Sequence, residues 1–111
     1  MHHKHEARLR DQRLNVNINA ATSTIILGCN EKRVGVLISV NTTGYISFGT
    51  PQTGQYGYPV TPTLPGSFYI DDIGNAIRED IYLYITGGGF CNVVDIFCDC
   101  EVRSAAAYMG A

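Results

Sequence analysis

Two acidic pairs, Asp71–Asp72 and Glu79–Asp80, are the residues of this chain whose types and spacing first indicate chemistry. Paired carboxylates carry out glycoside hydrolysis, and clusters of them bind calcium. The chain has no D-x-D-x-D-G calcium loop, and the pairs flank a segment of turn-forming residues, where Asp is favoured for its local hydrogen bonds. We therefore predict that these carboxylates are solvated turn residues without a catalytic or metal-binding role.

The other candidates for catalysis are poorly placed. His2, His3 and His5 all lie within the first five residues, in a segment expected to be mobile, whereas a catalytic triad requires a rigidly held base. The triple glycine at 87–89 is not followed by the Lys-Ser/Thr of a phosphate-binding loop, so it predicts a hairpin turn. We expect a protein that is not an enzyme and that needs no cofactor.

The chain has four cysteines, Cys29, Cys91, Cys98 and Cys100. Because the N-terminus lacks the apolar core of a secretory signal, we expect reduced thiols. Cys98 and Cys100 are two residues apart on a predicted strand and share one face, which indicates small buried side chains. A zinc site requires ligand pairs in two places, and the single C-x-C pair therefore predicts no metal site.

The segment from Arg33 to Gly49, RVGVLISVNTTGYISFG, is the element around which we expect the fold to be built. Apolar runs at 34–40 and 45–48 are separated by Asn, Thr and Gly, which favour turns, so the segment predicts a β-hairpin. The first run is predicted to turn one face to the core, comprising Val34, Val36, Ile38 and Val40. Its other face is mixed and is expected to lie partly covered or near solvent.

Further strands are predicted at 14–20, 22–27, 67–70, 81–86 and 90–103. In the last of these, Val94 and Ile96 share a face with the cysteines, and the acids Asp95, Asp99 and Glu101 are expected on the opposite face, toward solvent or a basic partner. Seven or eight short strands with almost no helix predict an all-β domain, a small β-sandwich or jelly-roll-like fold. We expect an N-terminal arm (1–13), a β-sandwich domain (14–103) and a C-terminal tail (104–111).

Charge is unevenly distributed along the chain. The formal net charge is -2, but residues 1–13 contain four basic and two acidic residues. A basic arm of this kind can bind nucleic acid or an acidic protein surface. The excess is small and the body lacks a basic patch with interleaved aromatic residues, so we expect a protein partner and no nucleic acid. No run of about 18 apolar residues predicts a membrane span.

All four prolines, together with Gly54, Gly57 and Gly66, lie between residues 50 and 66. Proline cannot donate to a strand ladder, so we predict a long loop with at most short edge pairing. Tyr56 and Tyr58 lie on this loop. They are expected either to anchor a contact with a partner or to cover the edge of the sandwich.

Several short motifs resemble those of small virion proteins of tailed phages. Between residues 30 and 102, the order EKRVGVLISVNTTGYISFG, then LPGSFY, then IREDIYLYITGGG is similar to the scheme of that group. The positions that carry the resemblance are Arg33, Ile38, Asn41, Ile46, Gly49, Leu64, Pro65, Gly66, Ile81, Leu83, Ile85 and Gly87. With its arm and tail, the chain most resembles the capsid decoration (cement or staple) proteins of short-tailed phages of the epsilon-15 type.

Membership of this group would imply a jelly-roll-like body on the outer capsid surface of the virion, after synthesis in the host cytoplasm. Such proteins bind the major capsid protein and other copies of themselves, expected here as a homodimer across symmetry axes, and reinforce the shell without a catalytic site. Neither a membrane nor nucleic acid would be a partner. The residues expected at the protein interface come from the arm, the proline-rich loop and the tail: Arg8, Arg10, Arg13, Tyr56, Tyr58, Tyr108 and Met109.

The phage group also includes receptor-binding modules of similar architecture, which gives an alternative function. The chain would then be a carbohydrate- or receptor-binding β-sandwich of a head fibre or tail. Sugar binding requires exposed aromatic rings over a groove, and Tyr82 and Tyr84, on one face of a predicted strand, would provide them.

Overall fold

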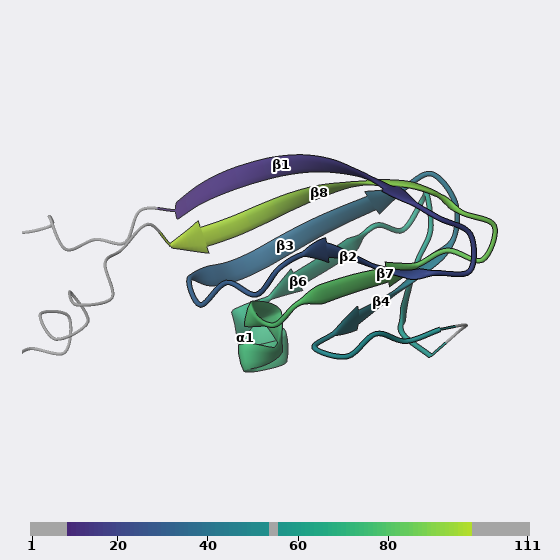
Figure 1. Cartoon of the computed structure of the whole chain (residues 1–111). Helices are drawn as coiled ribbons and strands as arrows, with labels where there is room; N and C mark the ends of the chain where they lie inside the picture. The colour runs from purple at the N-terminus through teal and green to yellow at the C-terminus, as the bar shows by residue number, and fades with distance from the viewer. Residues whose placement is uncertain (1–8, 54–55, 99–111) are drawn as a thin grey trace, which may run out of the picture.

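Eight strands form two four-stranded antiparallel sheets that pack face to face (Figure 1). This computed structural model describes residues 9–53 and 56–98. The β1 sheet has the order β1 (Leu9–Ile18), β8 (Gly89–Cys98), β3 (Arg33–Val40) and β6 (Gly66–Tyr69). The β2 sheet has the order β2 (Ser23–Leu27), β7 (Ile81–Tyr84), β4 (Gly44–Phe48) and β5 (Tyr58–Val60). A short helix, α1 (Ile70–Ile73), and a 3-10 turn, η2 (Gly74–Arg78), join β6 to β7.

The strand order is that of a jelly roll. The hydrogen-bonded pairs β1–β8, β2–β7, β3–β6 and β4–β5 nest inside one another, as in one long folded hairpin wrapped around a core. The pairs β8–β3 and β7–β4 then complete the two sheets. Eight strands in two sheets with this winding define the jelly-roll architecture, so the predicted all-β sandwich or jelly-roll-like fold is confirmed.

The hairpin predicted for residues 33–49 is wrong. Both strands form, but β3 lies in the β1 sheet and β4 in the β2 sheet, so residues 41–43 cross between the sheets. Ile38 of β3 and Ile46 of β4 are both fully buried, since the two strands face each other through the core instead of pairing side by side. Asn41 joins this crossing to the start of β8, because its side-chain oxygen accepts a hydrogen bond from the Phe90 N–H at 2.8 Å.

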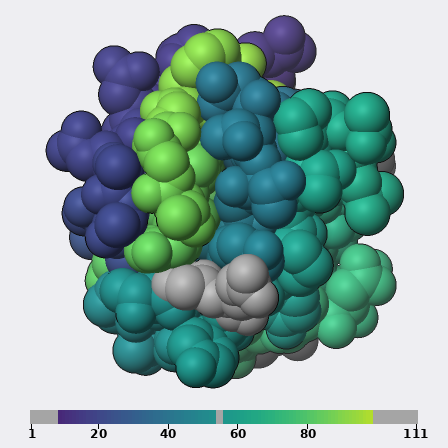
Figure 2. All heavy atoms as spheres, turned by 90° about the vertical axis from the view of Figure 1, so that its right-hand side faces the viewer, coloured from purple at the N-terminus to yellow at the C-terminus, as the bar shows by residue number. Residues whose placement is uncertain are grey.

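The triple glycine also marks a crossing between the sheets and not the predicted hairpin turn, because β7 and β8 belong to different sheets. Gly88 has a φ of 79°, a conformation that glycine adopts without steric cost. A Cβ at this position would lie 3.1 Å from the Ala20 nitrogen. Figure 2 views this end of the molecule and shows the green start of β8 between the indigo chain near β1 and the blue end of β3.

The faces of β8 are the reverse of those predicted. Val93 and Asp95 lie opposite Ile38 and Val36 of β3 and are buried with them, whereas Val94 and Ile96 point away from the core. Both faces of β8 are apolar in sequence, so alternation alone does not distinguish them. Asp95 is accommodated inside, at 5 % exposure, because a buried arginine neutralises it.

Arg33 is that arginine, and it is 1 % exposed. Its Nε donates to Asp95 Oδ1 at 2.8 Å, and its Nη2 donates to the Gly28 carbonyl at 2.6 Å. The Nη1 group donates to the carbonyl oxygens of Ile77 and Glu79 at 3.0 and 3.1 Å. The register of β3 on β8 shifts between Arg33 and Gly35, so Val34 is the extra residue of a bulge and is only half-buried instead of lying in the core as predicted.

The loops agree with most of the sequence expectations. Within the proline-rich segment the described residues form only the three-residue β5 and a bridge between Thr61 and Leu64, which confirms the predicted short edge pairing. Asp71, Asp72 and Glu79 are exposed, as predicted, although Asp71 and Asp72 belong to the one-turn helix α1 and not to a turn. Asp80 is half-buried and accepts a hydrogen bond from the Cys29 N–H at 2.7 Å.

The first strand begins inside the segment that the sequence assigned to the N-terminal arm. Residues 9–13, assigned to the arm from the sequence, form the first half of β1 and pair with β8. The expected boundary between residues 13 and 14 therefore falls inside a strand. Residues 1–8 and the tail at 104–111 lie outside the described residues.

One of the three described cysteines departs from the expected reduced state. Cys98 is in a disulfide, whereas reduced thiols were predicted, and it lies on the outward face of β8. Cys29 is an exposed free thiol. Cys91 is a free thiol at 0 % exposure on the core face of β8. Burial raises the pKa of the Cys91 thiol from 9.0 to about 11, and the backbone of Val16 lowers this pKa in part through a hydrogen bond.

The raised pKa of Cys91 makes the fold sensitive to alkaline conditions. The unfolded thiol ionises from about pH 9, whereas the folded thiol stays protonated until about pH 11. The unfolded state therefore binds fewer protons in this window, and the free energy of unfolding falls as pH rises. Urea unfolding between pH 8 and pH 11 is expected to show a steeper decline for the wild type than for Cys91→Ala; equal slopes would contradict this assignment.

Candidate protein-binding surface

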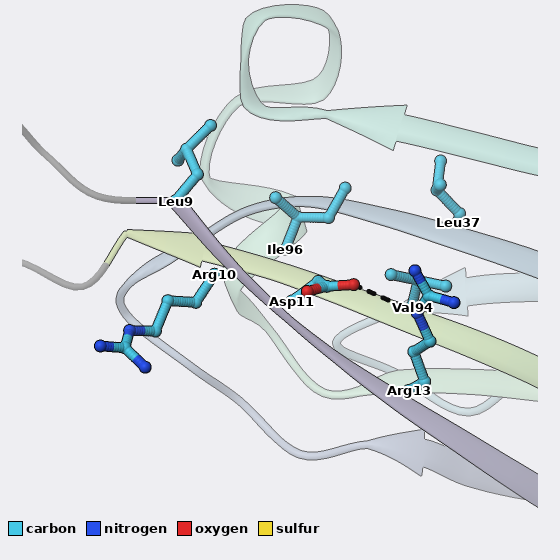
Figure 3. A pocket seen from close by; sticks show the side chains of 7 residues that line it. All are labelled: Leu9, Arg10, Asp11, Arg13, Leu37, Val94 and Ile96. Carbon is cyan, nitrogen blue, oxygen red and sulfur yellow. Dashed lines mark hydrogen bonds and ion pairs between the residues drawn. The ribbon is translucent and has the colours of Figure 1, made fainter.

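The outer face of the β1 sheet carries apolar side chains that no described part of the chain covers. The strand registers place Val94 of β8 between Arg13 of β1 and Leu37 of β3, and place Ile96 between Asp11 and Gly35. Figure 3 shows that Leu37, Val94 and Ile96 point to the same side of the sheet, with Leu9 beyond them. Leu9 is 65 % exposed, and the other three are half-buried by their neighbours.

An aromatic ring extends this surface toward the opposite edge of the sheet. Tyr69 of β6 pairs with Gly35 of β3, and a Cβ at position 35 would lie 2.7 Å from the Tyr69 ring. The ring therefore covers the space that a side chain at position 35 would fill, and it remains 40 % exposed. We call the resulting surface the apolar strip; it comprises Leu9, Leu37, Tyr69, Val94 and Ile96.

Two opposite charges border the apolar strip along β1. Arg13 Nε lies 3.2 Å from Asp11 Oδ2, and both side chains are at least half exposed. An exposed pair of this kind contributes about 0–1 kcal/mol to stability, so it leaves the two charges available for other partners. With the aliphatic side chains and Arg10, the pair lines a shallow hollow of about 350 Å³.

The strip ends in polar residues toward the turn end of the sheet. Asn15 of β1 and Asn92 of β8 lie opposite each other, and the Asn15 amide donates to the Asn92 side-chain oxygen at 2.9 Å. Ser39, the next residue of that row on β3, is exposed. The surface is thus an apolar centre with charged and amide groups at its border, the composition typical of a protein–protein interface.

The described interface residues expected from the sequence, Arg10, Arg13, Tyr56 and Tyr58, do not lie on one surface. Arg13 borders the strip. Arg10 also lines the hollow, but its side chain extends away from the strip residues (Figure 3). The arm arginine Arg8 and the tail residues Tyr108 and Met109 lie outside the described residues.

Tyr56 and Tyr58 lie at the other edge of the sandwich. Tyr56 is 82 % exposed and Tyr58, in the edge strand β5, is 51 % exposed. The Tyr58 ring makes edge-to-face contacts with Phe48 and Phe68, at centroid distances of 5.9 and 5.5 Å. Phe48 and Phe68 belong to different sheets, so this cluster closes the sandwich edge, and Tyr56 is the more accessible of the two tyrosines.

The aromatic platform expected for sugar binding is largely covered. Tyr82 and Tyr84 share the outer face of β7, as predicted, because Ile81 and Leu83 on the other face are fully buried. Tyr84 is only 9 % exposed, which leaves little ring area for stacking on a sugar. Its neighbours across the sheet are Ser23 of β2 and Tyr45 of β4.

The apolar strip is the surface that sequence reasoning missed. Val94 and Ile96 were assigned to the core because they alternate with acids, and Leu37 was recognised only as part of a mixed face. A signal in the sequence is Arg33, because an arginine at the start of a buried strand needs an acidic partner, and Asp95 is an acid within a long apolar strand.

Within residues 9–53 and 56–98, no cluster of three or more His, Cys, Asp or Glu side chains forms a metal-binding group. The same part of the chain contains no helix long and apolar enough to cross a membrane. Comparison of the chain with protein-family models, curated proteins and solved structures finds no match.

Proposed function

We propose that this protein is a structural component of a tailed-phage virion that binds the outer capsid surface and staples neighbouring major capsid subunits together. The observation that carries the proposal is the apolar strip, whose central residues Leu37, Val94 and Ile96 lie on an outer sheet face that no described part of the chain covers. Exposed apolar area on a rigid sheet is favourable for docking, since binding removes it from water without ordering new backbone.

The composition supports a docking role over a catalytic one. Charged residues make up 16 % of the chain, below the usual quarter, and the described titratable groups do not assemble into an acid–base pair in a cavity. Jelly rolls occur in viral capsid proteins and in lectins, so the architecture is compatible with both candidate functions. Fold alone does not select between them.

Substitution in the strip tests the proposal directly. Val94→Asp and Ile96→Asp each place a charge where a docked surface would exclude water, and an unpaired buried charge is costly. Each is expected to weaken binding to shells of the cognate major capsid protein by at least about tenfold. Co-sedimentation with shells assembled without the protein measures the effect.

Ile25→Asp is the matched control, because Ile25 is 49 % exposed on β2, in the other sheet. It should bind shells as the wild type does. Removal of residues 1–8 tests the arm separately and leaves β1 intact, whereas a deletion to residue 13 would remove half of that strand. Unchanged binding of both strip variants would refute the proposed docking face.

The alternative, a carbohydrate-binding module of a fibre or tail, predicts the opposite pattern. Glycan-array binding that is lost in Tyr82→Ala and Tyr84→Ala, and retained in Val94→Asp, would favour it. The burial of Tyr84 disfavours this outcome.

A further inference from the structure

The four edge strands of the sandwich differ in how well they resist pairing with another chain. β5 has three residues and contains Pro59, which has no N–H to donate. β6 has four residues and directly follows Pro65. β2 has five residues, and its register is interrupted between Ile25 and Leu27. Short length, proline and bulges are three of the means by which proteins protect sheet edges, and charged side chains are another.

β1 has none of these three protections. It is ten residues long, contains neither proline nor glycine, and keeps an unbroken register with β8 from Leu9 to Ile18. It is an edge of its sheet, and it lies at the upper border of the molecule in Figure 1. Within the described residues, no strand pairs with its outer side. Residues 9–13 are exposed.

The charges on β1 identify the partner that this edge fits. Asp11 and Arg13 lie on the same outward face, on either side of Gln12. In an antiparallel pair of identical strands related by a two-fold axis through Gln12, Asp11 of each strand lies opposite Arg13 of the other. Directly opposite residues of unlike charge stabilise an antiparallel pair. In the single chain the two side chains contact each other, and pairing would give each a second partner.

We propose that two copies of this chain associate through their β1 edges, as an antiparallel pair centred on Gln12 that joins the two β1 sheets into one eight-stranded sheet. Closed two-fold pairing is the commonest form of homo-oligomer, and in this register the charges that would repel other strands at the β1 edge are matched between the two copies. The apolar strips of the two copies would then lie on one continuous face. The inference rests on the edge strands alone and does not depend on the proposed capsid role.

Charge reversal tests the register. Asp11→Arg places two pairs of like charges across the axis, and so does Arg13→Asp. Each single variant is expected to raise the dimer dissociation constant by about tenfold, and the double variant D11R/R13D should return it to near the wild-type value. Sedimentation equilibrium of the full-length chain at low salt measures this, against a monomer mass of 12.1 kDa.

A cysteine on the axis gives a second, geometric test. Opposite Cα atoms in an antiparallel pair are about 4.5–5.5 Å apart, within the range that a disulfide spans. Gln12→Cys should therefore form a covalent dimer on mild oxidation, beyond any background from the native thiols. Ser39→Cys, exposed on the inner strand β3 of the same sheet, is the matched control and should not.

A wild-type chain that is monomeric at high micromolar concentration would overturn the proposal. A dimer whose stability is the same in both single charge variants would overturn it too, because the interface would then lie elsewhere. A dimer that fails to bind capsid shells would leave this inference standing and count only against the proposed function.

Discussion

Replacing Arg33 with methionine is expected to lower the free energy of unfolding by about 3–5 kcal/mol, the range for breaking one side of a buried ion pair. The substitution leaves Asp95 as an uncompensated charge at 5 % exposure. It also removes the donors to the carbonyl oxygens of Gly28, Ile77 and Glu79. These carbonyls belong to the β2–β3 turn and to η2 and its end, so both turns would lose a common attachment.

Urea unfolding followed by circular dichroism measures this effect. Arg13→Met is the control, because Arg13 is in an exposed ion pair with Asp11, and it should cost less than about 1 kcal/mol. The double variant R33M/D95L removes both charges and should recover part of the loss, but not all of it, since the three carbonyls still lack their donor. A cost for Arg33→Met no greater than that of the control would show that the buried network does not hold the turns.

The strands could be predicted from the sequence, but their pairing could not. Alternation placed Ile81 and Leu83 on one face of β7, and Val36, Ile38 and Val40 on one face of β3, and all five are buried. The strands β3 and β4 also end and begin where the turn-forming residues predicted a break, at residues 41–43. Turn chemistry says only that the chain reverses, and a reversal within one sheet and a crossing between two sheets use the same residues. The choice depends on which strands bury each other's apolar faces, and this involves residues far apart in the sequence.

The prediction of which face of β8 is buried was wrong for a different reason. An acid within an apolar strand is normally evidence for the solvent face, because burial of an isolated carboxylate is very costly. Here Asp95 is compensated by Arg33, which is 62 residues away in sequence. The bulge at Val34 turns Arg33 inward against the alternation of β3. A buried acid in β8 and an interrupted alternation in β3 thus occur together, because the inward Arg33 neutralises Asp95 and Asp95 in turn neutralises Arg33.

The positions that carry the resemblance to phage proteins are mainly positions that form the fold. Arg33 holds the buried network, Ile38 and Ile46 lie in the core, and Asn41 binds the start of β8. Gly49 has a φ of 82° and donates its N–H to the Asp80 carbonyl at 2.7 Å. The resemblance is therefore evidence about the fold. The proposed function has to be tested on surface residues outside those motifs, above all on the apolar strip.

Leu83→Ala is expected to have the second large effect on stability, a loss of about 2–5 kcal/mol, typical of a leucine truncated in a core. Leu83 is fully buried on β7 and lies opposite Ile46 of β4. The cost within that range depends on how far the neighbours can close the cavity. Urea unfolding measures it, and Tyr82→Ala, on the half-buried outer face of the same strand, provides a milder comparison.

A methyl group added at Gly44 of the neighbouring strand β4 tests whether the cavity left by Leu83→Ala can be filled. Gly44 does not have a positive φ. Instead, a Cβ at position 44 would lie 2.9 Å from Leu83 Cδ1 and 3.1 Å from the Tyr84 carbonyl oxygen. Gly44→Ala alone should therefore cost about 1–3 kcal/mol through overpacking. In L83A/G44A the added methyl group enters the space that Leu83 vacates, so the double variant should be more stable than the sum of the single losses by about 0.5 kcal/mol or more. Additive losses would mean that the limit at position 44 is set by the Tyr84 backbone or by Ile85, whose Cγ1 lies 3.0 Å from the added Cβ, because the double variant removes only the Leu83 side chain.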